Sequence, residues 1–223
     1  PWDAGLGTAG WAVWKYTNST NIARDPGAIA FIWETPPEDP TSFNGAAFAL
    51  SANIDSVLAR MNATNATYTE NAMSFMSPPN PTNLAMLKNR GAKMMVYHGT
   101  SDPIFSSDDT KNWYDSLAAA NGGSAANFAR YYPVPGMNHC SGGPATDQFD
   151  MLTPLVNWVE KGQAPTAVVA TARGAGNPGG VNTDVPSTWA ANRTRPLCPY
   201  PQVARYKGSG SMEDAANFSC VSP

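Results

Sequence analysis

Two apolar runs with strand composition stand out in the middle of the chain, and each is followed by a glycine-containing loop. The first run covers Lys93–Tyr97 and its loop leads to Asp102. The second covers Phe128–Val134 and its loop leads to His139. Short apolar runs bounded by Gly and Pro are typical of buried β-strands. Each predicted strand therefore ends in a loop that presents one ionisable side chain.

A helical period of apolar positions separates these two strands. Ser106 or Ser107 is placed to cap a helix at its N-terminus, and acidic residues follow in the first turn. Apolar residues from Trp113 to Ala120 share one face of this helix. Gly122 follows directly and is expected to end it.

A second helix is expected after the second strand. Thr146 or Asp147 is placed to cap it, apolar residues recur at helical spacing from Phe149 to Val159, and Gly162 is expected to stop it. The order strand, helix, strand, helix predicts a βαβ unit with a parallel sheet and right-handed crossovers. The fold class is therefore α/β.

The two ends of the chain have weaker patterns. Trp2–Thr67 mixes aromatic residues with Gly, Pro and Asn and shows no sustained period, which is typical of an insertion or cap. Short helices are predicted at Asn53–Met61 and Asn83–Arg90. From Gln163 onward the chain is expected to be mostly irregular, with Val168–Ala172 pairing as an edge strand.

The composition and net charge of the chain limit which classes of binding partner are expected. The chain has 223 residues, of which 42% are hydrophobic and 14% charged, below the usual quarter for charged residues. Its net charge of −3 argues against nucleic acid and anionic membrane as partners. Low charge with abundant Asn, Thr, Ser, Gly and Pro is typical of exported proteins. Because the sequence starts at Pro1 without Met, we expect it to be a fragment of a longer protein.

Three cysteines bear on the cellular compartment. In an oxidising compartment Cys198 and Cys220 would close a C-terminal loop, worth about 3 kcal/mol in the chain-entropy model. Cys140 would then be the odd one, which suggests a partner elsewhere. The alternative is three reduced, buried thiols in a cytosolic protein.

Asp102 followed by His139, each just past a strand, matches the order of acid and base in α/β-hydrolases. The aspartate would accept a hydrogen bond from the imidazole, and the histidine would act as general base and then general acid. The alternative is that Asp102 only forms a turn and caps the next helix, and that His139 is structural. No G-x-S-x-G sequence occurs, so a nucleophilic serine is expected before Pro1 or on another chain.

His98 raises a different possibility. Together with Asp102 and His139 it would supply the side chains of a two-histidine, one-carboxylate metal site. In the usual site of this kind, histidine and carboxylate lie closer in sequence. We therefore assign no metal ligand to this chain.

Three stretches carry a resemblance to a known family: Lys93–Phe105, Val134–Gly143 and Arg195–Gly210. They resemble the C-terminal part of the tannase/feruloyl esterase family, and the resemblance extends over the whole chain and is closer to the bacterial members. It implies the C-terminal half of an α/β-hydrolase fold with part of a lid domain. The lid part would cover residues 1–72 and the catalytic part residues 73–223.

The resemblance also assigns roles to individual residues. Asp102 and His139 would be the acid and base of a Ser-His-Asp triad. Cys140 would bond to a cysteine immediately before the nucleophilic serine, outside this chain. Cys198 and Cys220 would form the terminal disulfide.

Substrate contacts follow from the same resemblance. His98 and Phe105 would line the acyl pocket, and Trp11 and Arg24 would be lid positions that touch the substrate. In terephthalate monoester hydrolases of the family a phenylalanine is expected four residues after this arginine, where this chain has Ala28. That difference argues against terephthalate monoesters. The family's structural calcium lies in the lid upstream, so no cofactor is expected in this chain.

The resulting expectation is part of a secreted or periplasmic serine esterase that hydrolyses feruloyl- or galloyl-type esters of aromatic acids. Its partners would be the N-terminal part of the same enzyme and a small aromatic ester, with neither nucleic acid nor membrane. Two alternatives stay open: a terephthalate monoester hydrolase of the same family, and a fragment that binds ligands without turnover.

Overall fold

The computed structural model describes residues 3–17 and 25–223. The chain divides into two compact units. One unit joins Pro1–Trp11 with Thr82–Pro223, and the other is Ala12–Pro81.

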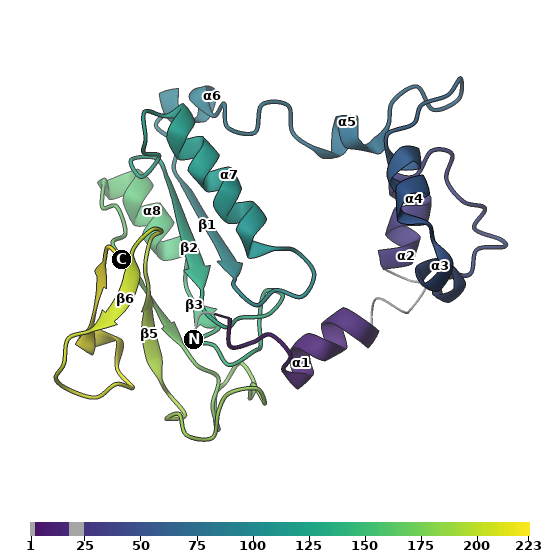
Figure 1. The fold of residues 1–223 in the computed structure, drawn as a ribbon. Helices are drawn as coiled ribbons and strands as arrows, with labels where there is room; N and C mark the ends of the chain where they lie inside the picture. Colours follow the sequence, from purple (N-terminus) through teal and green to yellow (C-terminus); the bar gives the residue numbers. More distant parts are fainter. Residues whose placement is uncertain (1–2, 18–24) are drawn as a thin grey trace. The chain divides into compact units, whose positions relative to one another are not determined.

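The first unit is built on two parallel strands joined by a helix (Figure 1). Strand β1 (Met94–Gly99) pairs with β2 (Ala129–Val134), in a register that runs from Met94 opposite Ala129 to Gly99 opposite Val134. Helix α7 (Ser107–Ala120) connects them. The predicted βαβ unit with a parallel sheet is confirmed.

Alternation along these strands directs side chains into two separate cores, because successive residues of a strand point to opposite faces. Tyr131 belongs to one core, together with the α7 residues Tyr114 and Leu117. Its neighbour Tyr132 belongs to the other core, with residues of the C-terminal strands such as Leu197. All five of these side chains are buried. The two strands are thus covered by α7 on one face and by antiparallel strands on the other.

The ends of α7 follow its local signals. The Ser106 hydroxyl accepts a hydrogen bond from the Asp108 N–H at 3.2 Å, as expected of an N-cap. After the helix, Gly122 and Gly123 have φ of 75° and 94°, a left-handed conformation that glycine adopts without steric cost. Both predicted boundaries are confirmed.

The start of the second helix was predicted at the wrong place. Helix α8 is Leu152–Lys161, and the Asp150 carboxylate accepts hydrogen bonds from the first N–H groups. The residues before it form strand β3 (Gln148–Phe149), which contains the phenylalanine expected on the helix. Asp147 does not cap the helix, because its buried carboxylate is paired with Arg173. The predicted end is confirmed, since Gly162 has φ of 68°.

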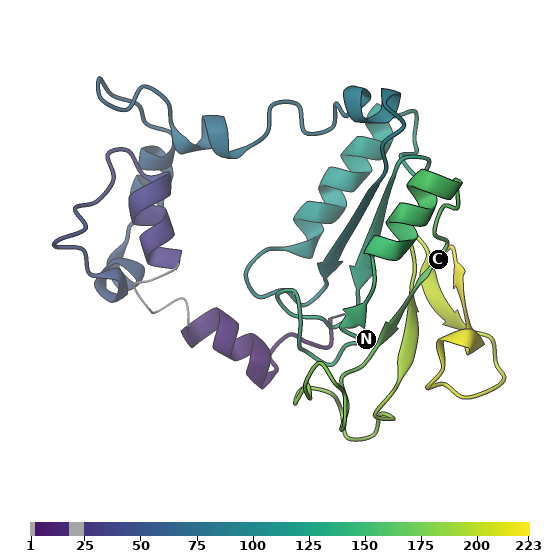
Figure 2. The ribbon, with the colours of Figure 1, turned by 180° about the vertical axis from the view of Figure 1, so that it is seen from behind.

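The C-terminal region is more ordered than the sequence predicted. Strand β4 (Val168–Thr171) lies between β3 and β5 (Thr194–Leu197) in an antiparallel sheet, so the prediction of an edge strand is wrong. Strands β6 (Val203–Tyr206) and β7 (Phe218–Val221) form an antiparallel pair beyond it (Figure 2). The predicted disulfide between Cys198 and Cys220 is confirmed and joins the end of β5 to β7. Short helices α6 (Ala85–Asn89) and η3 (Ala215–Asn217) complete the unit.

The described residues of the second unit form several short helices, of which the sequence predicted the one at Asn53–Met61 but not the others. Three of its aromatic rings cluster together: the ring of Phe43 lies 4.9 Å from that of Phe31 and 5.4 Å from that of Phe48, measured between centroids. The helices are η1 (Val13–Thr17), α2 (Asp25–Ala28), η2 (Ile29–Trp33), α3 (Gly45–Ser51), α4 (Ile54–Met61) and α5 (Ala72–Met76). Helix α1 (Ala9–Ala12) precedes them at the boundary of the units.

The second unit also contains a charged pair of which only the carboxylate is buried. The Arg60 guanidinium lies 3.2 Å from the carboxylate of Glu34, whose side chain is fully buried. Burial raises the pKa of Glu34, and the nearby arginine acts in the opposite direction.

No helix in the described residues combines the length and apolar character that a bilayer span requires. The assignment of residues 1–72 to a lid stays a prediction.

Candidate active site

The loops after β1 and β2 are bonded to each other. The Thr100 N–H donates to the Val134 carbonyl at 3.0 Å, and the Thr100 hydroxyl accepts from the Gly136 N–H at 3.0 Å. The Ser101 N–H donates to the Met137 carbonyl at 3.0 Å. A Cβ on Gly99 would lie 2.3 Å from that same carbonyl oxygen, so the close approach of the loops requires glycine here. These contacts fix the two ionisable residues relative to each other.

Asp102 and His139 form a hydrogen bond, as the sequence predicted for a catalytic pair. The imidazole Nδ1 donates to Asp102 Oδ2 at 2.8 Å. Asp102 Oδ1 accepts from the N–H groups of Ile104 at 2.7 Å and Phe105 at 3.0 Å. The aspartate side chain is 3% exposed and the histidine 26%, so the carboxylate is enclosed while the imidazole reaches the surface.

A second imidazole approaches the same carboxylate oxygen. His98 is the fifth residue of β1, and its Nε2 lies 3.3 Å from Asp102 Oδ2. Its other ring nitrogen, Nδ1, lies 2.8 Å from the hydroxyl of Thr110 on α7. Sequence reasoning did not identify Thr110, although its place on the helix that follows Asp102 was a usable signal.

These hydrogen bonds control the charge of Asp102. Burial by itself would raise the pKa of the carboxyl. The hydrogen bonds from His98, His139 and the two backbone N–H groups outweigh burial and hold the pKa well below its usual range. Asp102 is therefore ionised at neutral pH. A buried, oriented carboxylate stabilises the imidazolium that forms when its partner histidine takes up a proton.

The loop that carries His139 is braced by acidic side chains. Asp147 Oδ2 accepts from the Gly142 N–H at 2.8 Å and from Arg173 at 2.6 Å. The Asp184 carboxylate accepts from the Gly143 N–H at 3.2 Å. Sequence reasoning missed this role of Asp147 because its partner Arg173 lies 26 residues away, at the end of the predicted strand Val168–Ala172.

The comparisons with known proteins bear on this site. A family model described as "Tannase and feruloyl esterase" matches residues 9–221. The chain belongs to the tannase and feruloyl esterase family. It is 45% identical over 237 aligned positions to the mono(2-hydroxyethyl) terephthalate hydrolase of Piscinibacter sakaiensis, covering 100% of this chain and 37% of that protein. It is also 34% identical over 155 positions to a probable feruloyl esterase B-2 of Neosartorya fischeri, covering 62% of this chain and 28% of the relative.

Solved structures agree on the fold. The chain matches a crystal structure of an esterase from Aspergillus oryzae with TM-score 0.55 and 26% identity, covering 87% of this chain and 36% of the other. It matches feruloyl esterase B from the same organism with TM-score 0.56 and 24% identity, covering 94% and 39%. The predicted α/β-hydrolase fold is confirmed. The chain spans well under half the length of these relatives and neighbours.

Two of the predicted substrate contacts, Phe105 and Trp11, lie within the described residues. The Phe105 ring lies 5.6 Å from the His139 ring between centroids, and Phe105 is 63% exposed. Trp11 lies on α1, where its backbone N–H donates to the Thr8 hydroxyl at 3.4 Å. Arg24 lies outside the described residues. Contact of these side chains with a substrate stays a prediction.

Cys140, the residue after His139, has an exposed thiol and a φ of 62°, in the left-handed region. Gly142 and Gly143, two and three residues further on, also have positive φ, so the chain turns sharply here. The Cys140 thiol is thus exposed in a turn directly after His139. Within the described residues no group of three or more His, Cys, Asp or Glu side chains is arranged to hold a metal ion.

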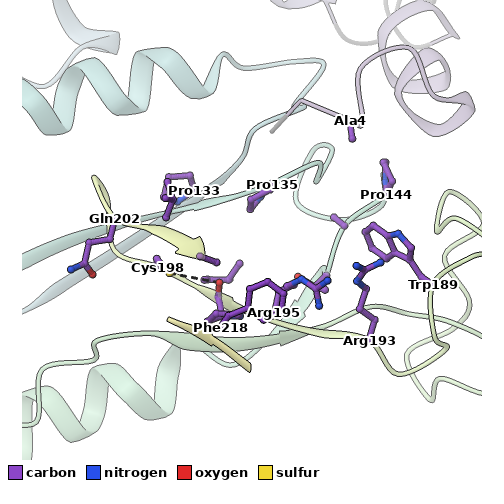
Figure 3. Close-up of a pocket in the computed structure, with 16 residues that line it drawn as sticks. Ala4, Pro133, Pro135, Pro144, Trp189, Arg193, Arg195, Cys198, Gln202 and Phe218 are labelled. Carbon is purple, nitrogen blue, oxygen red and sulfur yellow. Dashed lines mark hydrogen bonds between the residues drawn. The ribbon is translucent and has the colours of Figure 1, made fainter. Parts of the chain in front are cut away.

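A cavity of about 500 Å³ lies among the C-terminal strands (Figure 3). Arg193 stacks on the Trp189 ring at 4.1 Å and Arg195 on the Phe218 ring at 4.3 Å, measured to the ring centroids. Burial lowers the pKa of both arginines, and Glu213 lies 3.5 Å from the Arg193 guanidinium. Neither member of the aspartate–histidine pair lines this cavity, which is therefore separate from the candidate active site.

Proposed function

We propose that this chain supplies the acid and base of a serine ester hydrolase. The observation that carries the proposal is the 2.8 Å hydrogen bond between His139 Nδ1 and Asp102 Oδ2 at the carboxyl ends of two adjacent parallel strands. Aspartate before histidine is the chain order of α/β-hydrolase triads. Ester hydrolysis is also what the names of the two relatives describe.

The acid–base steps follow from the geometry. Because Nδ1 of His139 is engaged with Asp102, Nε2 is the nitrogen that takes the proton from the serine hydroxyl as its oxygen attacks the ester carbonyl. The imidazolium then gives this proton to the departing alcohol, which leaves an acyl-serine. In the second half, Nε2 takes a proton from water as the water oxygen attacks the acyl-serine. The proton returns to the serine oxygen as the acid is released.

The nucleophilic serine would come from the N-terminal part of the same enzyme. We propose that the exposed Cys140 is disulfide-bonded to a cysteine immediately before that serine, which would hold the serine beside His139. A mass spectrum of the non-reduced enzyme tests this pairing, with a Cys140 peptide joined to a Cys-Ser peptide as the expected species. The Cys198–Cys220 disulfide favours an oxidising compartment, in keeping with a secreted or periplasmic enzyme.

Esters of aromatic acids are the proposed substrates. The exposed Phe105 ring beside His139 offers a surface on which an aromatic acyl group would pack. Feruloyl- and galloyl-type esters are the first candidates. The 45% identity to a terephthalate monoester hydrolase over the whole chain supports the second candidate, although Ala28 replaces the phenylalanine expected in that enzyme type.

Hydrolysis of three esters by the complete enzyme tests these alternatives. Methyl ferulate, methyl gallate and mono(2-hydroxyethyl) terephthalate would each be followed by release of the free acid. We expect hydrolysis of at least one, and the highest kcat/KM identifies the acyl group. Binding of all three without release of acid would instead support a fragment that holds ligands without turnover, and would refute the esterase.

A further inference from the structure

Asp102 receives more hydrogen bonds than the acid–base pair alone requires. An ionised carboxylate has about four acceptor sites, two on each oxygen. Oδ1 is occupied by the N–H groups of Ile104 and Phe105, and Oδ2 by His139 at 2.8 Å and His98 at 3.3 Å. Because the side chain is only 3% exposed, water has little access to replace any of these donors.

The protonation of His98 follows from its two partners. The carboxylate of Asp102 only accepts, so the nitrogen that faces it, Nε2, carries a proton. In the neutral ring the other nitrogen, Nδ1, is then an acceptor, and the Thr110 hydroxyl at 2.8 Å is its donor. The order of donation is thus Thr110 to His98 and His98 to Asp102. This chain of hydrogen bonds ties helix α7 to the end of strand β1.

His98 is poorly placed to contact a substrate. Its side chain is 14% exposed, against 26% for His139, and both of its ring nitrogens have partners within the protein. The expectation that it lines the acyl pocket stays a prediction, while its ring nitrogens are engaged within the protein. Its polar atoms are used to hold Asp102.

We propose that His98 and Thr110 are positioning residues that act on the reaction only through Asp102. The inference rests on the proposed esterase function. His98 prevents the carboxylate from turning away from the plane in which Oδ2 meets the His139 imidazole. Thr110 holds His98 in the tautomer that donates to Asp102. Neither residue exchanges a proton with the substrate.

Loss of the His98 donor would change the orientation of the catalytic base, His139. With His98 replaced by an apolar residue, Oδ2 keeps one donor, and the carboxylate is free to rotate within the limits that Oδ1 allows. A small displacement of Oδ2 moves the imidazole, and misplacement of a catalytic group by about 1 Å lowers the rate on the order of a hundredfold. Ground-state binding of the ester is unaffected, because no contact to it is lost. The effect is therefore expected in kcat rather than in KM.

Four single variants of the complete enzyme test the proposal. His98→Leu removes the donor, whereas His98→Gln places an amide N–H near the position of Nε2. Thr110→Val removes the hydroxyl with little change of shape, whereas Thr110→Ser keeps it. Ser116→Ala is the matched control, because this exposed serine on the same helix bonds only to a carbonyl of that helix. Thermal melting of each variant reports whether it folds.

We expect His98→Leu to lower kcat by about ten- to a hundredfold and Thr110→Val to lower it by a smaller factor, with KM changed less than about twofold. His98→Gln and Thr110→Ser should restore most of the activity, and the control should match the wild type. Wild-type kcat in folded His98→Leu would overturn the proposal. So would a raised KM with unchanged kcat, which would place His98 in the substrate pocket.

A double-mutant cycle tests whether His98 affects the rate through Asp102. In an Asp102→Ala background, His98→Leu should have no further effect on the residual rate, because the carboxylate it positions is absent. A full additional loss in that background would overturn the proposal. The proposed esterase function fails on different results: no release of acid from any of the three esters, or a folded His139→Ala variant that keeps activity within about tenfold of the wild type. If His98→Leu does not fold, the comparison of Thr110→Val with Thr110→Ser decides.

Discussion

The buried pair of Asp147 and Arg173 offers a sharp test of how the histidine loop is held. The Asp147 side chain is fully buried and that of Arg173 is 19% exposed, and their closest atoms are 2.6 Å apart. Asp147 also accepts from the Gly142 N–H, three residues after His139. Loss of the arginine would leave a buried carboxylate with one remaining donor. The histidine loop would then be held less firmly.

Arg173→Met removes the charge while keeping most of the aliphatic volume. Breaking a buried ion pair by removing one partner costs about 3–5 kcal/mol, and the partial exposure of Arg173 places the expected loss near the lower end. Lys111→Met is the matched control. The Lys111–Asp115 pair is 2.8 Å long, but its side chains are 41% and 45% exposed. Exposed pairs of this kind contribute about 0–1 kcal/mol.

Urea unfolding of the complete enzyme measures both losses, from the shift of the midpoint and the slope of the transition. Arg173→Met should lose about 3 kcal/mol, whereas Lys111→Met should leave the urea midpoint nearly unchanged. Adding Asp147→Leu to Arg173→Met should recover part of the loss, because the unpaired buried charge is then gone. Equal, small losses in the two single variants would refute the reasoning.

Three further predictions concern the same unit. Cys198→Ser opens the loop closed by the disulfide to Cys220 and should lower the free energy of unfolding by about 3 kcal/mol; an unchanged urea midpoint would contradict this. Gly99→Ala brings a Cβ against the Met137 carbonyl and should lower kcat at least about tenfold, and a kcat equal to the wild type would show that the loops need not approach so closely. The lowered pKa of Asp102 means that its carboxylate contributes stability above its unfolded pKa, near 3.8, and loses it as the pH falls toward the native value. Between about pH 5 and pH 3 the wild type should therefore lose more stability than Asp102→Asn, and equal losses would argue against the lowered pKa.

Features set by neighbouring residues were predictable from the sequence. Helix α7 begins at a serine cap and ends before two glycines, and both signals act within a few residues. The parallel pairing of β1 with β2 followed from the strand–helix–strand order. The hydrogen bond between Asp102 and His139 then followed from the meeting of the strands' carboxyl ends.

Features set by distant contacts were not predictable. Asp147 is a residue type that often caps helices, but here its buried carboxylate is held by the guanidinium of Arg173, and the helix begins after it. Strands β5, β6 and β7 are four residues each, and one contains a proline, so their pattern is weak until partners and the Cys198–Cys220 disulfide bring them together. The contact of His98 with Asp102 depends on the geometry of the turn between them. Its hydrogen bond to Thr110 depends on how α7 packs.

The central claim is that His139, oriented by Asp102, is the base of an ester hydrolase. The measurement that tests it most directly is kcat/KM of the complete enzyme and of its His139→Ala variant on the best ester of the three, with the melting temperature of each. We expect kcat/KM to fall by on the order of 10⁴–10⁶-fold while the melting temperature stays close to that of the wild type. A folded variant that keeps activity within about tenfold of the wild type would contradict the claim.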